Sequence, residues 1–280
     1  MILIADSGST KVSWRVLHAD GTTQVIQTIG INPFFVEESK ILETLSRDLK
    51  SGITGKIDQV FFYGAGVAGQ DKIDILCRCF QAVFPGCEAH AYSDLLAAAR
   101  CLCGNEKGIA AILGTGANSC FYDGENIVDN VPACGYILGD EGGGAVLGKK
   151  FVSDYLKRQL PPDLKEAFDR QYHLTMLDII EKVYRQPMPN RFLASFALFL
   201  GDHQTHPYVH QFLARAFDEF FQRNIAHYDY KTYPVNIVGS VAYFFRNHVE
   251  EAAARNGMTI GKIVRTPIEG LVTYHKNLMQ

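Results

Sequence analysis

The hydrophobic pattern at the start of the chain predicts three short strands joined by polar turns. Residues 2–5 are apolar and end at Asp6, and residues 12–17 then alternate between apolar and polar positions. Such alternation is typical of a strand with one buried face. Asp20-Gly21 is a hairpin turn signal, and residues 22–29 supply the third strand. We therefore predict an antiparallel meander.

Helical and strand patterns then alternate through the rest of the first 105 residues. Apolar residues recur at helical spacing in three segments, and two buried-type strands separate them. Strands alternating with helices indicate a largely parallel α/β arrangement. The predicted elements are a helix within 34–50, a strand at 60–63, a helix over about 71–84, a strand at 88–92, and a helix at 94–103 with Ser93 as its N-cap.

The opening pattern recurs 108 residues later, when Gly116 is set on Gly8 and Asn118 on Thr10. Strand, glycine turn, strand, Asp-Gly turn and strand follow one another in both places. Internal similarity of this kind determines architecture. We predict two related domains, each opening with a glycine-turn hairpin and facing the other.

The glycines divide the second half of the chain. Residues 104–148 hold 11 of the 25 glycines, whereas residues 149–238 hold only Gly201. The first stretch predicts tight turns or close backbone contacts, and the second predicts helices. The elements expected here are a helix from about Glu141 to Leu160, helices through about 230, a strand at 235–238, a helix to about Arg255, a strand at 259–264 and a final helix at 267–278.

The composition excludes several classes of protein. Lysine and arginine number 27 and aspartate and glutamate 30, with no basic block, which argues against nucleic-acid binding. No run of 18 apolar residues predicts a membrane span, and the first six residues lack the basic region of a signal peptide. Seven cysteines, an odd number, favour a reducing compartment, so we expect a cytoplasmic protein.

Two glycine motifs match nucleotide fingerprints literally. Residues 64–69 read G-x-G-x-x-G after a strand and before a helix, with Glu88 about 20 residues on. That strand comes fourth, after a meander, whereas the usual dinucleotide unit begins with it, so a tight turn lining a cleft is the better interpretation. Residues 143–150 read G-x-x-x-x-G-K-K, but Lys150 stands where magnesium binding needs Ser or Thr.

The paired hairpin turns offer a better phosphate chemistry. The first runs from Asp6 through Gly8, Ser9 and Thr10 to Lys11, and so combines a carboxylate, exposed backbone N–H groups, hydroxyls and a cation. Such turns can bind phosphate oxygens, and Asp6 could hold Mg²⁺ through water. The second turn has Gly114, Thr115, Gly116 and Asn118 in the equivalent places. Two facing turns predict a cleft for a triphosphate.

With these turns, the other motifs of the chain resemble those of the N-acetylglucosamine kinase group and the related BadF-BadG-type ATPases of the sugar kinase–Hsp70–actin superfamily. The resemblance covers nearly the whole chain, and its strength lies in the order and spacing of the motifs. The matching segments are 6–11 and 113–119 for phosphate, 138–142 (LGDEG), 238–241 for adenosine with Gly239 and Ser240, 92–98 around Asp94, and 30–33 around Asn32.

The resemblance implies two ribonuclease-H-like domains facing an interdomain cleft. The first would span residues 1–105, with the last helix (266–280) a candidate to complete it. The second would span 106–265 and carry a helical insert at 150–230.

The resemblance also implies roles for single residues. Asp94 would be the general base, although the sequence alone favours a simple helix cap or first-turn helix acid at this position. Asn32 and Asp140 would bind sugar hydroxyls, and Gly135 lies in the segment that touches the sugar; Asp140 also suits an acidic helix start. Members of the group usually have Trp just before LGDEG, whereas Cys134, Gly135 and Tyr136 stand here, which leaves the sugar open.

The activity implied is transfer of the γ-phosphate of ATP, with Mg²⁺, to the 6-hydroxyl of an amino sugar, N-acetylglucosamine first. Glucosamine, N-acetylmuramate and other hexoses are alternative substrates. An ATPase that regulates or activates a partner protein is the alternative of another class. We also expect a homodimer and no nucleic-acid or membrane partner.

Cysteine and histidine groups suggest metal sites only weakly. Cys77 and Cys79, like Cys101 and Cys103, would point about 200° apart on a helix. A thiolate cluster needs four well-placed ligands, so we interpret these thiols as buried. The histidines at 203, 206 and 210 lack the H-E-x-x-H pattern, and a solvated helix start is the better interpretation.

Overall fold

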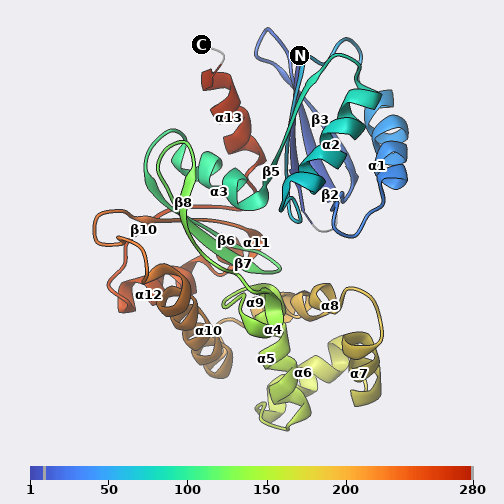
Figure 1. Ribbon diagram of the computed structural model, residues 1–280. Coiled ribbons are helices and arrows are strands. Elements are labelled where there is room, and N and C mark those ends of the chain that lie inside the picture. The colour runs from blue at the N-terminus through green and yellow to red at the C-terminus, as the bar shows by residue number, and fades with distance from the viewer. Residues whose placement is uncertain (9–10, 279–280) are drawn as a thin grey trace. The chain divides into compact units, whose positions relative to one another are not determined.

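The computed structural model describes residues 1–8 and 11–278 (Figure 1). The chain divides into two compact units. Unit 1 comprises Met1–Glu106, Gly124–Asn126 and Thr266–Gln280, and unit 2 comprises Lys107–Asp123 and Ile127–Arg265.

The sheet of unit 1 begins with the predicted meander. Its spatial order is β3-β2-β1-β4-β5. β1, β2 and β3 are antiparallel neighbours, whereas β4 and β5 run parallel to β1. The strands are β1 (Ile2–Ser7), β2 (Lys11–Leu17), β3 (Thr23–Ile29), β4 (Gln59–Gly64) and β5 (Glu88–Ser93).

Helices cover both faces of this sheet, because its central strands are apolar on both sides. One face packs Trp14, Phe62 and Phe80 against α1 (Glu38–Thr44), the π-turn η1 (Leu45–Leu49), the short η2 (Lys50–Gly52) and α2 (Gln70–Val83). The other face packs under α3 (Asp94–Cys103) and α13 (Ile268–Leu278), as Figure 1 shows. Trp14, at an apolar position of the alternating segment 12–17, is fully buried, and the predicted Ser93 cap of α3 is confirmed.

The helix predicted within 34–50 begins later than its apolar pattern suggests. The N–H groups of Phe35 and Val36 bond the carbonyl of Asn32 in a turn, and α1 starts only at Glu38. Phe35, whose apolarity contributed to the prediction, is 75% exposed.

The sheet of unit 2 repeats the order of the first sheet. Written from its antiparallel edge it is β8-β7-β6-β9-β10, with β9 and β10 parallel to β6. The internal repeat is thereby confirmed at the level of topology, as is the prediction of two ribonuclease-H-like α/β folds. The strands are β6 (Gly108–Leu113), β7 (Ala117–Tyr122), β8 (Ile127–Val131), β9 (Val235–Val238) and β10 (Ile260–Val264).

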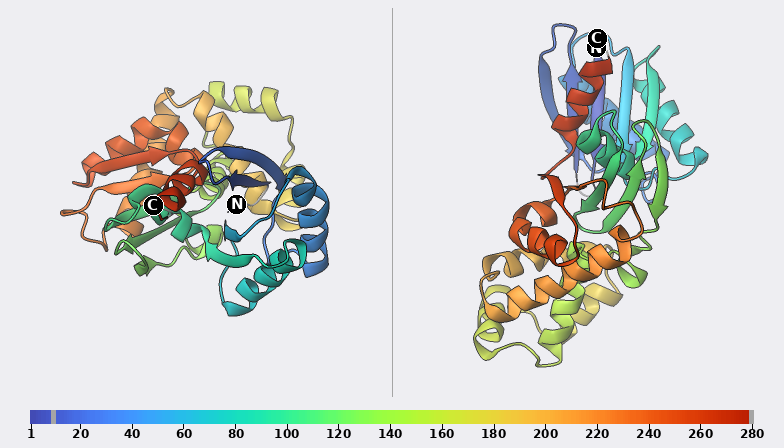
Figure 2. Two further views of the ribbon diagram at one scale, coloured as in Figure 1. Left: turned by 90° about the horizontal axis from the view of Figure 1, so that it is seen from above. Right: turned by 90° about the vertical axis from the view of Figure 1, so that its left-hand side faces the viewer.

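The segment between β8 and β9 is helical, and Figure 2 shows its helices grouped beside the sheet of unit 2. Their shared core is aromatic, with Phe151, Phe168, Phe199 and Phe217 fully buried. The helices are α4 (Gly135–Leu138), α5 (Gly144–Leu156), α6 (Pro162–Tyr172), α7 (Met176–Tyr184), α8 (Pro189–Ser195), α9 (Ala197–Asp202), α10 (Pro207–Phe220) and the π-turn η3 (Phe221–Ile225).

Two predicted helices in unit 2 have other bounds. The helix expected from Glu141 to Leu160 is shorter, because Asp140 and Gly142 before it and Arg158 after it have positive φ. The helix expected after Gly239 is broken at Phe245 into α11 (Ser240–Phe244) and α12 (Arg246–Arg255). Among the described residues, no helix has the length and apolarity to cross a membrane.

A glycine in α13, Gly270, allows that helix to approach α3 closely. We therefore predict that replacing it with alanine destabilises the fold, whereas Gly→Ala within a helix usually stabilises it. A Cβ on Gly270 would lie 2.4 Å from Cys101 Sγ and 3.0 Å from its Cα. Gly→Ala within a helix normally stabilises by about 0.5–1 kcal/mol, but overpacking costs about 1–3 kcal/mol. We expect Gly270→Ala to lower the free energy of unfolding, measured by urea denaturation.

Gly201 in α9 is the matched control. A Cβ there would meet only Phe245 ring atoms at ordinary distances of 3.9 and 4.0 Å, so Gly201→Ala should be neutral or stabilising. Equal stability changes in the two variants would contradict the packing described for α13.

Candidate functional site

The first candidate half-site lies where β1 turns into β2. Asp6 and Ser7 end β1, and Lys11 begins β2. The Gly8 N–H donates to the Lys11 carbonyl at 3.1 Å and closes the hairpin. Ser9 and Thr10, both predicted phosphate ligands, lie outside the described residues.

The parallel strands bring Asp6 and Asp94 to the same edge of the sheet. Ser7 of β1 is in register with Gly64 of β4, which is in register with Ser93 of β5. Asp94 follows Ser93 as the first residue of α3, and the Ser93 hydroxyl accepts a bond from Leu96 N at 3.2 Å. β1 and β5 are two strand spacings apart, about 10 Å, and the charge of Asp94 acts on Asp6 across this distance.

Burial and this proximity together shift the pKa of Asp6. Burial, and then the charge of Asp94, raise the pKa of Asp6 to about 7, whereas Lys11 lowers it. A desolvated carboxylate beside a second carboxylate is the arrangement that a hard divalent cation stabilises. These residues therefore fit a magnesium site.

Asn32 is held beside this pair by two contacts that the sequence did not reveal. The Ser7 hydroxyl donates to the Ile31 carbonyl at 2.7 Å and accepts from the Ile31 N–H at 3.3 Å. The Asn32 Oδ1 accepts from Phe34 N at 2.9 Å. The loop that carries Asn32 is thus anchored to the end of β1.

The glycine motif at 64–69 seats this loop. Gly66 has φ 79°, and a Cβ on it would lie 2.1 Å from Asn32 Oδ1. The motif forms the turn between β4 and α2, and Gly66 is needed for the close approach of Asn32. In the sequence, the only indication of this role was the G-x-G-x-x-G motif, which follows the fourth strand, whereas the motif of a dinucleotide site follows the first.

The second candidate half-site, in unit 2, is the turn between β6 and β7. Gly114 N donates to Gly116 O at 3.0 Å. The first N–H groups of α5 reach the same turn, with Gly144 N donating to Gly114 O and Ala145 N to Thr115 O, each at 2.8 Å. The start of α5 therefore fixes the two carbonyls of the turn and with them the direction of its peptide groups.

Asp140 braces this turn from the LGDEG loop. Its Oδ1 accepts from Ala117 N at 3.1 Å, and its own carbonyl accepts from Gly143 N at 2.9 Å. Partial burial raises the pKa of Asp140, and the bond from Ala117 opposes that shift. A Cβ on Gly116 would lie 2.8 Å from Asp140 Oδ2. Asp140 thus has a bracing contact within the chain in addition to any contact with a sugar.

Glu141, next to Asp140, makes structural contacts within unit 2. It is 7% exposed and pairs with Arg223 at 2.6 Å, and its other oxygen accepts from Asn224 at 3.2 Å. The LGDEG loop is therefore tied to η3 on one side and to the glycine turn on the other.

The remaining residues predicted for unit 2 lie around the same edge. Asn118 Oδ1 accepts from Ser119 N and from Asn130 Nδ2, so it is occupied along the hairpin. Gly135, with φ 71°, opens α4, and Lys149 holds that helix by donating to the Tyr136 carbonyl.

Gly239, predicted to lie in the turn that faces the nucleotide base, closely approaches the end of β6. It has φ 136°, and a Cβ on it would lie 2.1 Å from the Leu113 carbonyl. Only glycine allows β9 to end this close to β6. Ser240 follows as the first residue of α11.

Of the predicted site residues, those that the structure describes therefore lie together within each unit. Asp6, Lys11, Asn32 and Asp94 gather in unit 1; the turn at 114–116, Asp140 and Gly239 gather in unit 2. The described parts of the chain contain no group of three or more His, Cys, Asp or Glu side chains arranged to hold a metal ion by themselves. A cation at Asp6 would therefore need phosphate oxygens or water as further ligands.

Solved structures give the comparison. The chain is 42% identical to a candidate N-acetylglucosamine kinase from Porphyromonas gingivalis, with full coverage of both chains and a TM-score of 0.93. A candidate N-acetylglucosamine kinase from Chromobacterium violaceum matches at 18% identity over 98% of each chain, with a TM-score of 0.74.

A non-polymerising variant of MamK bound to AMPPNP is more distant. It matches at 13% identity over 100% of this chain and 98% of that one, with a TM-score of 0.52. These last two likenesses show the fold alone. No family profile and no curated protein matches the sequence.

Because the pKa of Asp6 is raised, we predict that replacing Asp6 with a neutral residue stabilises the fold by an amount that depends on pH. A carboxyl whose pKa rises on folding contributes stability below pH 4 and loses it as the pH rises towards 7. Asp6→Asn should therefore unfold with a larger free energy than wild type at pH 8, by roughly 1–3 kcal/mol. At pH 4 the difference should be small. Urea titrations with a chelator present measure it.

Asp71→Asn is the control, because Asp71 is 70% exposed in the first turn of α2. Its stability relative to wild type should change little between the two pH values. A pH-independent effect of Asp6→Asn would contradict the buried charge.

Two glycines of one turn test the brace from Asp140. Gly116→Ala places a methyl group against the Asp140 carboxylate, whereas a Cβ on Gly114 meets nothing within 4 Å. We expect Gly116→Ala to lower the free energy of unfolding by about 1–2 kcal/mol and Gly114→Ala to change it by less than about 0.5 kcal/mol. The reverse order would show that Asp140 does not brace the turn.

Proposed function

Because the chain belongs to the N-acetylglucosamine kinase-like family of the sugar kinase–Hsp70–actin superfamily, and is therefore an ATP-dependent sugar kinase, we propose that it transfers the γ-phosphate of ATP to the 6-hydroxyl of N-acetylglucosamine. The observation that carries this proposal is the Asp6–Asp94 pair, two interacting carboxyl groups at the carboxyl edge of parallel strands with Lys11 beside them.

In this proposal Asp94 is the general base. Its carboxylate accepts the proton of the sugar 6-hydroxyl as that oxygen forms a bond to the γ-phosphorus and ADP leaves with the bridging oxygen. Phosphoryl transfer depends mainly on positioning and charge stabilisation, so one carboxylate in the correct place is sufficient. The Ser93 cap and the ordered start of α3 hold Asp94 in a fixed position.

Asp6 and the glycine turns have electrostatic roles. Asp6 would hold Mg²⁺ through water, and the cation would neutralise charge on the phosphate oxygens. Backbone N–H groups of the turns at 8–11 and 114–116 would bind phosphate oxygens. Gly239 and Ser240 would bind the adenosine at the end of β9, which Gly239 allows to lie close to the end of β6.

Asn32, Gly135 and Asp140 would bind the sugar. Asn32 is fixed by its bond from Phe34 N, so its amide group can donate to a hydroxyl without first being ordered. Cys134 is exposed beside Gly135, where a Trp is usual in the group. The smaller side chain leaves glucosamine, N-acetylmuramate and other hexoses as alternative substrates, which a substrate panel would separate.

Asp94→Asn tests the assignment of the base. ATP binding should stay within about threefold of wild type, while sugar-dependent ADP release falls by roughly two to four decades. Isothermal titration with ATP and a coupled ADP assay over a panel of amino sugars give the two quantities.

Asp71→Asn again serves as control, since Asp71 also lies in the first turn of a helix that follows a parallel strand. Near-normal turnover in Asp94→Asn would place the base elsewhere. ATP turnover that no sugar increases would favour the partner-regulating ATPase instead.

A further inference from the structure

A groove of about 540 Å³ lies between α5 and α10 in unit 2. Its lining residues are not those assigned to ATP or the sugar, although Lys149 contacts Tyr136 beside Gly135. α5 lines it with Lys149, Lys150 and Ser153, and α10 lines it with Arg215 and Glu219. Its volume is within the range of small-molecule sites.

The carboxylates of this groove already have partners. Glu219 pairs with Lys150, and Asp154 accepts a bond from the Tyr208 hydroxyl at 2.6 Å. That bond and the burial of the ring raise the pKa of Tyr208, which therefore stays a neutral donor. Lys150 thus neutralises Glu219, whereas Asp154 keeps its charge and can accept further bonds; the groove lining holds the cations Lys149, Lys150 and Arg215 against these two carboxylates.

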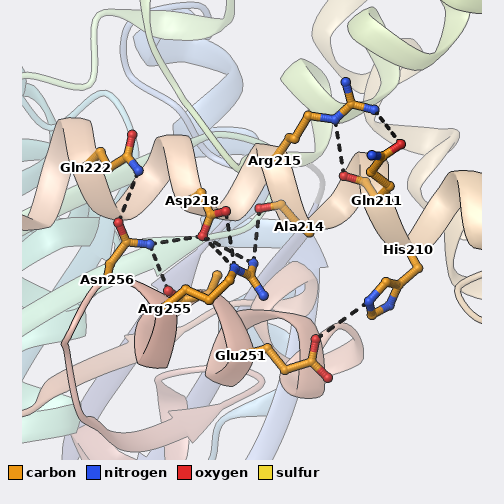
Figure 3. Close-up of polar contacts among 10 residues, drawn as sticks. His210, Gln211, Ala214, Arg215, Asp218, Gln222, Glu251, Arg255 and Asn256 are labelled. Carbon is orange, nitrogen blue, oxygen red and sulfur yellow. Dashed lines mark hydrogen bonds and ion pairs between the residues drawn. The ribbon is translucent and has the colours of Figure 1, made fainter.

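Arg215 has no acidic partner among the ion pairs of the described residues. Its Nη2 donates to Gln211 Oε1, a neutral acceptor on the same helix, at 3.0 Å. Figure 3 shows the Arg215 side chain turned toward Gln211, whereas Asp218 contacts Arg255 and Asn256. The Asp218 carboxylate is occupied there by Arg255 and Asn256 of the neighbouring α12 segment. The guanidinium of Arg215 is thus left for a ligand.

Among the ion pairs of the described residues, Lys149 likewise has no carboxylate partner. Its ammonium donates to the Tyr136 carbonyl in α4, a neutral acceptor that an anion would outcompete. The exposed Ser153 adds a hydroxyl donor on the same side.

We propose that this groove binds a small phosphorylated sugar. Arg215 would bind the phosphate through paired N–H donors, a geometry that guanidinium groups provide, with Ser153 and Lys149 as further donors. Tyr208 and Phe212 stack with their planes 20° apart and form an apolar wall for the sugar ring. The carboxylate of Asp154 would accept bonds from sugar hydroxyls.

The groove is linked to the proposed sugar site through Lys149. An anion beside Lys149 draws its ammonium from the Tyr136 carbonyl and releases α4, the helix that Gly135 opens. The bound phosphorylated sugar would then weaken binding of the sugar substrate, which is feedback by a product or by a later metabolite of the same chemistry. This regulatory role, unlike the binding itself, rests on the proposed kinase function.

The test measures binding of N-acetylglucosamine 6-phosphate and of glucose 6-phosphate by isothermal titration. Each titration is made without N-acetylglucosamine, and again with it saturating to occupy the substrate site, because coupling between the two sites is reciprocal. Arg215→Gln should raise the Kd for at least one of these phosphates tenfold or more and leave kcat without added phosphate unchanged. Lys157→Gln, which removes an exposed cation at the end of α5 outside the groove, should leave the Kd unchanged.

A steady-state assay then separates the groove from the reaction. The phosphorylated sugar should raise the apparent KM for the substrate several-fold in wild type and in Lys157→Gln, and should do so at least fivefold less in Arg215→Gln. Absence of binding to wild type at 10 mM, or equal Kd values in wild type and Arg215→Gln, would overturn the proposal. Because binding is measured without turnover, either result stands whether or not the chain phosphorylates N-acetylglucosamine.

Discussion

The desolvated carboxyl group of Asp6, held beside Asp94, is the interaction on which this account depends. β4, the parallel neighbour of β1, and β5 beyond it bring Asp94 to the same sheet edge, and burial with the charge of Asp94 gives a carboxyl whose pKa lies near 7. A fold selected only for stability would place an amide there. The pair is therefore best explained as a site in which a cation and a transferring phosphoryl group supply the missing positive charge and ligands.

Close approach of backbone to side chain is the second constraint, and both units meet it with glycine. Gly66 admits Asn32, Gly116 admits Asp140, and Gly239 admits the carbonyl of Leu113. In each case a Cβ would lie within 3 Å of the group that it faces. The glycine-rich stretches of the chain thus mark places where polar groups must be brought together with little intervening volume.

Much of the fold could be predicted because its signals are local. The repeated hairpins, the Ser93 cap and the burial of Trp14 follow from periodicity and turn chemistry, and the repeat predicted that the two sheets are related. The bounds at Asp140, Arg158 and Phe245 could not be predicted, because they depend on backbone conformations that tertiary contacts impose. The same is true of the site: the resemblance named Asn32 and Asp140, but the contacts that hold them, from Ser7, Gly66 and Ala117, join segments far apart in the sequence.

The central claim is that the protein phosphorylates an amino sugar at its 6-hydroxyl. Phosphorus–proton correlation NMR of the product formed from ATP, Mg²⁺ and N-acetylglucosamine tests it most directly. The account predicts a phosphomonoester whose phosphorus couples to the two protons on C6, formed in equal amount with ADP. ATP hydrolysis to free phosphate with no sugar phosphate, for N-acetylglucosamine and for every other amino sugar supplied, would contradict it.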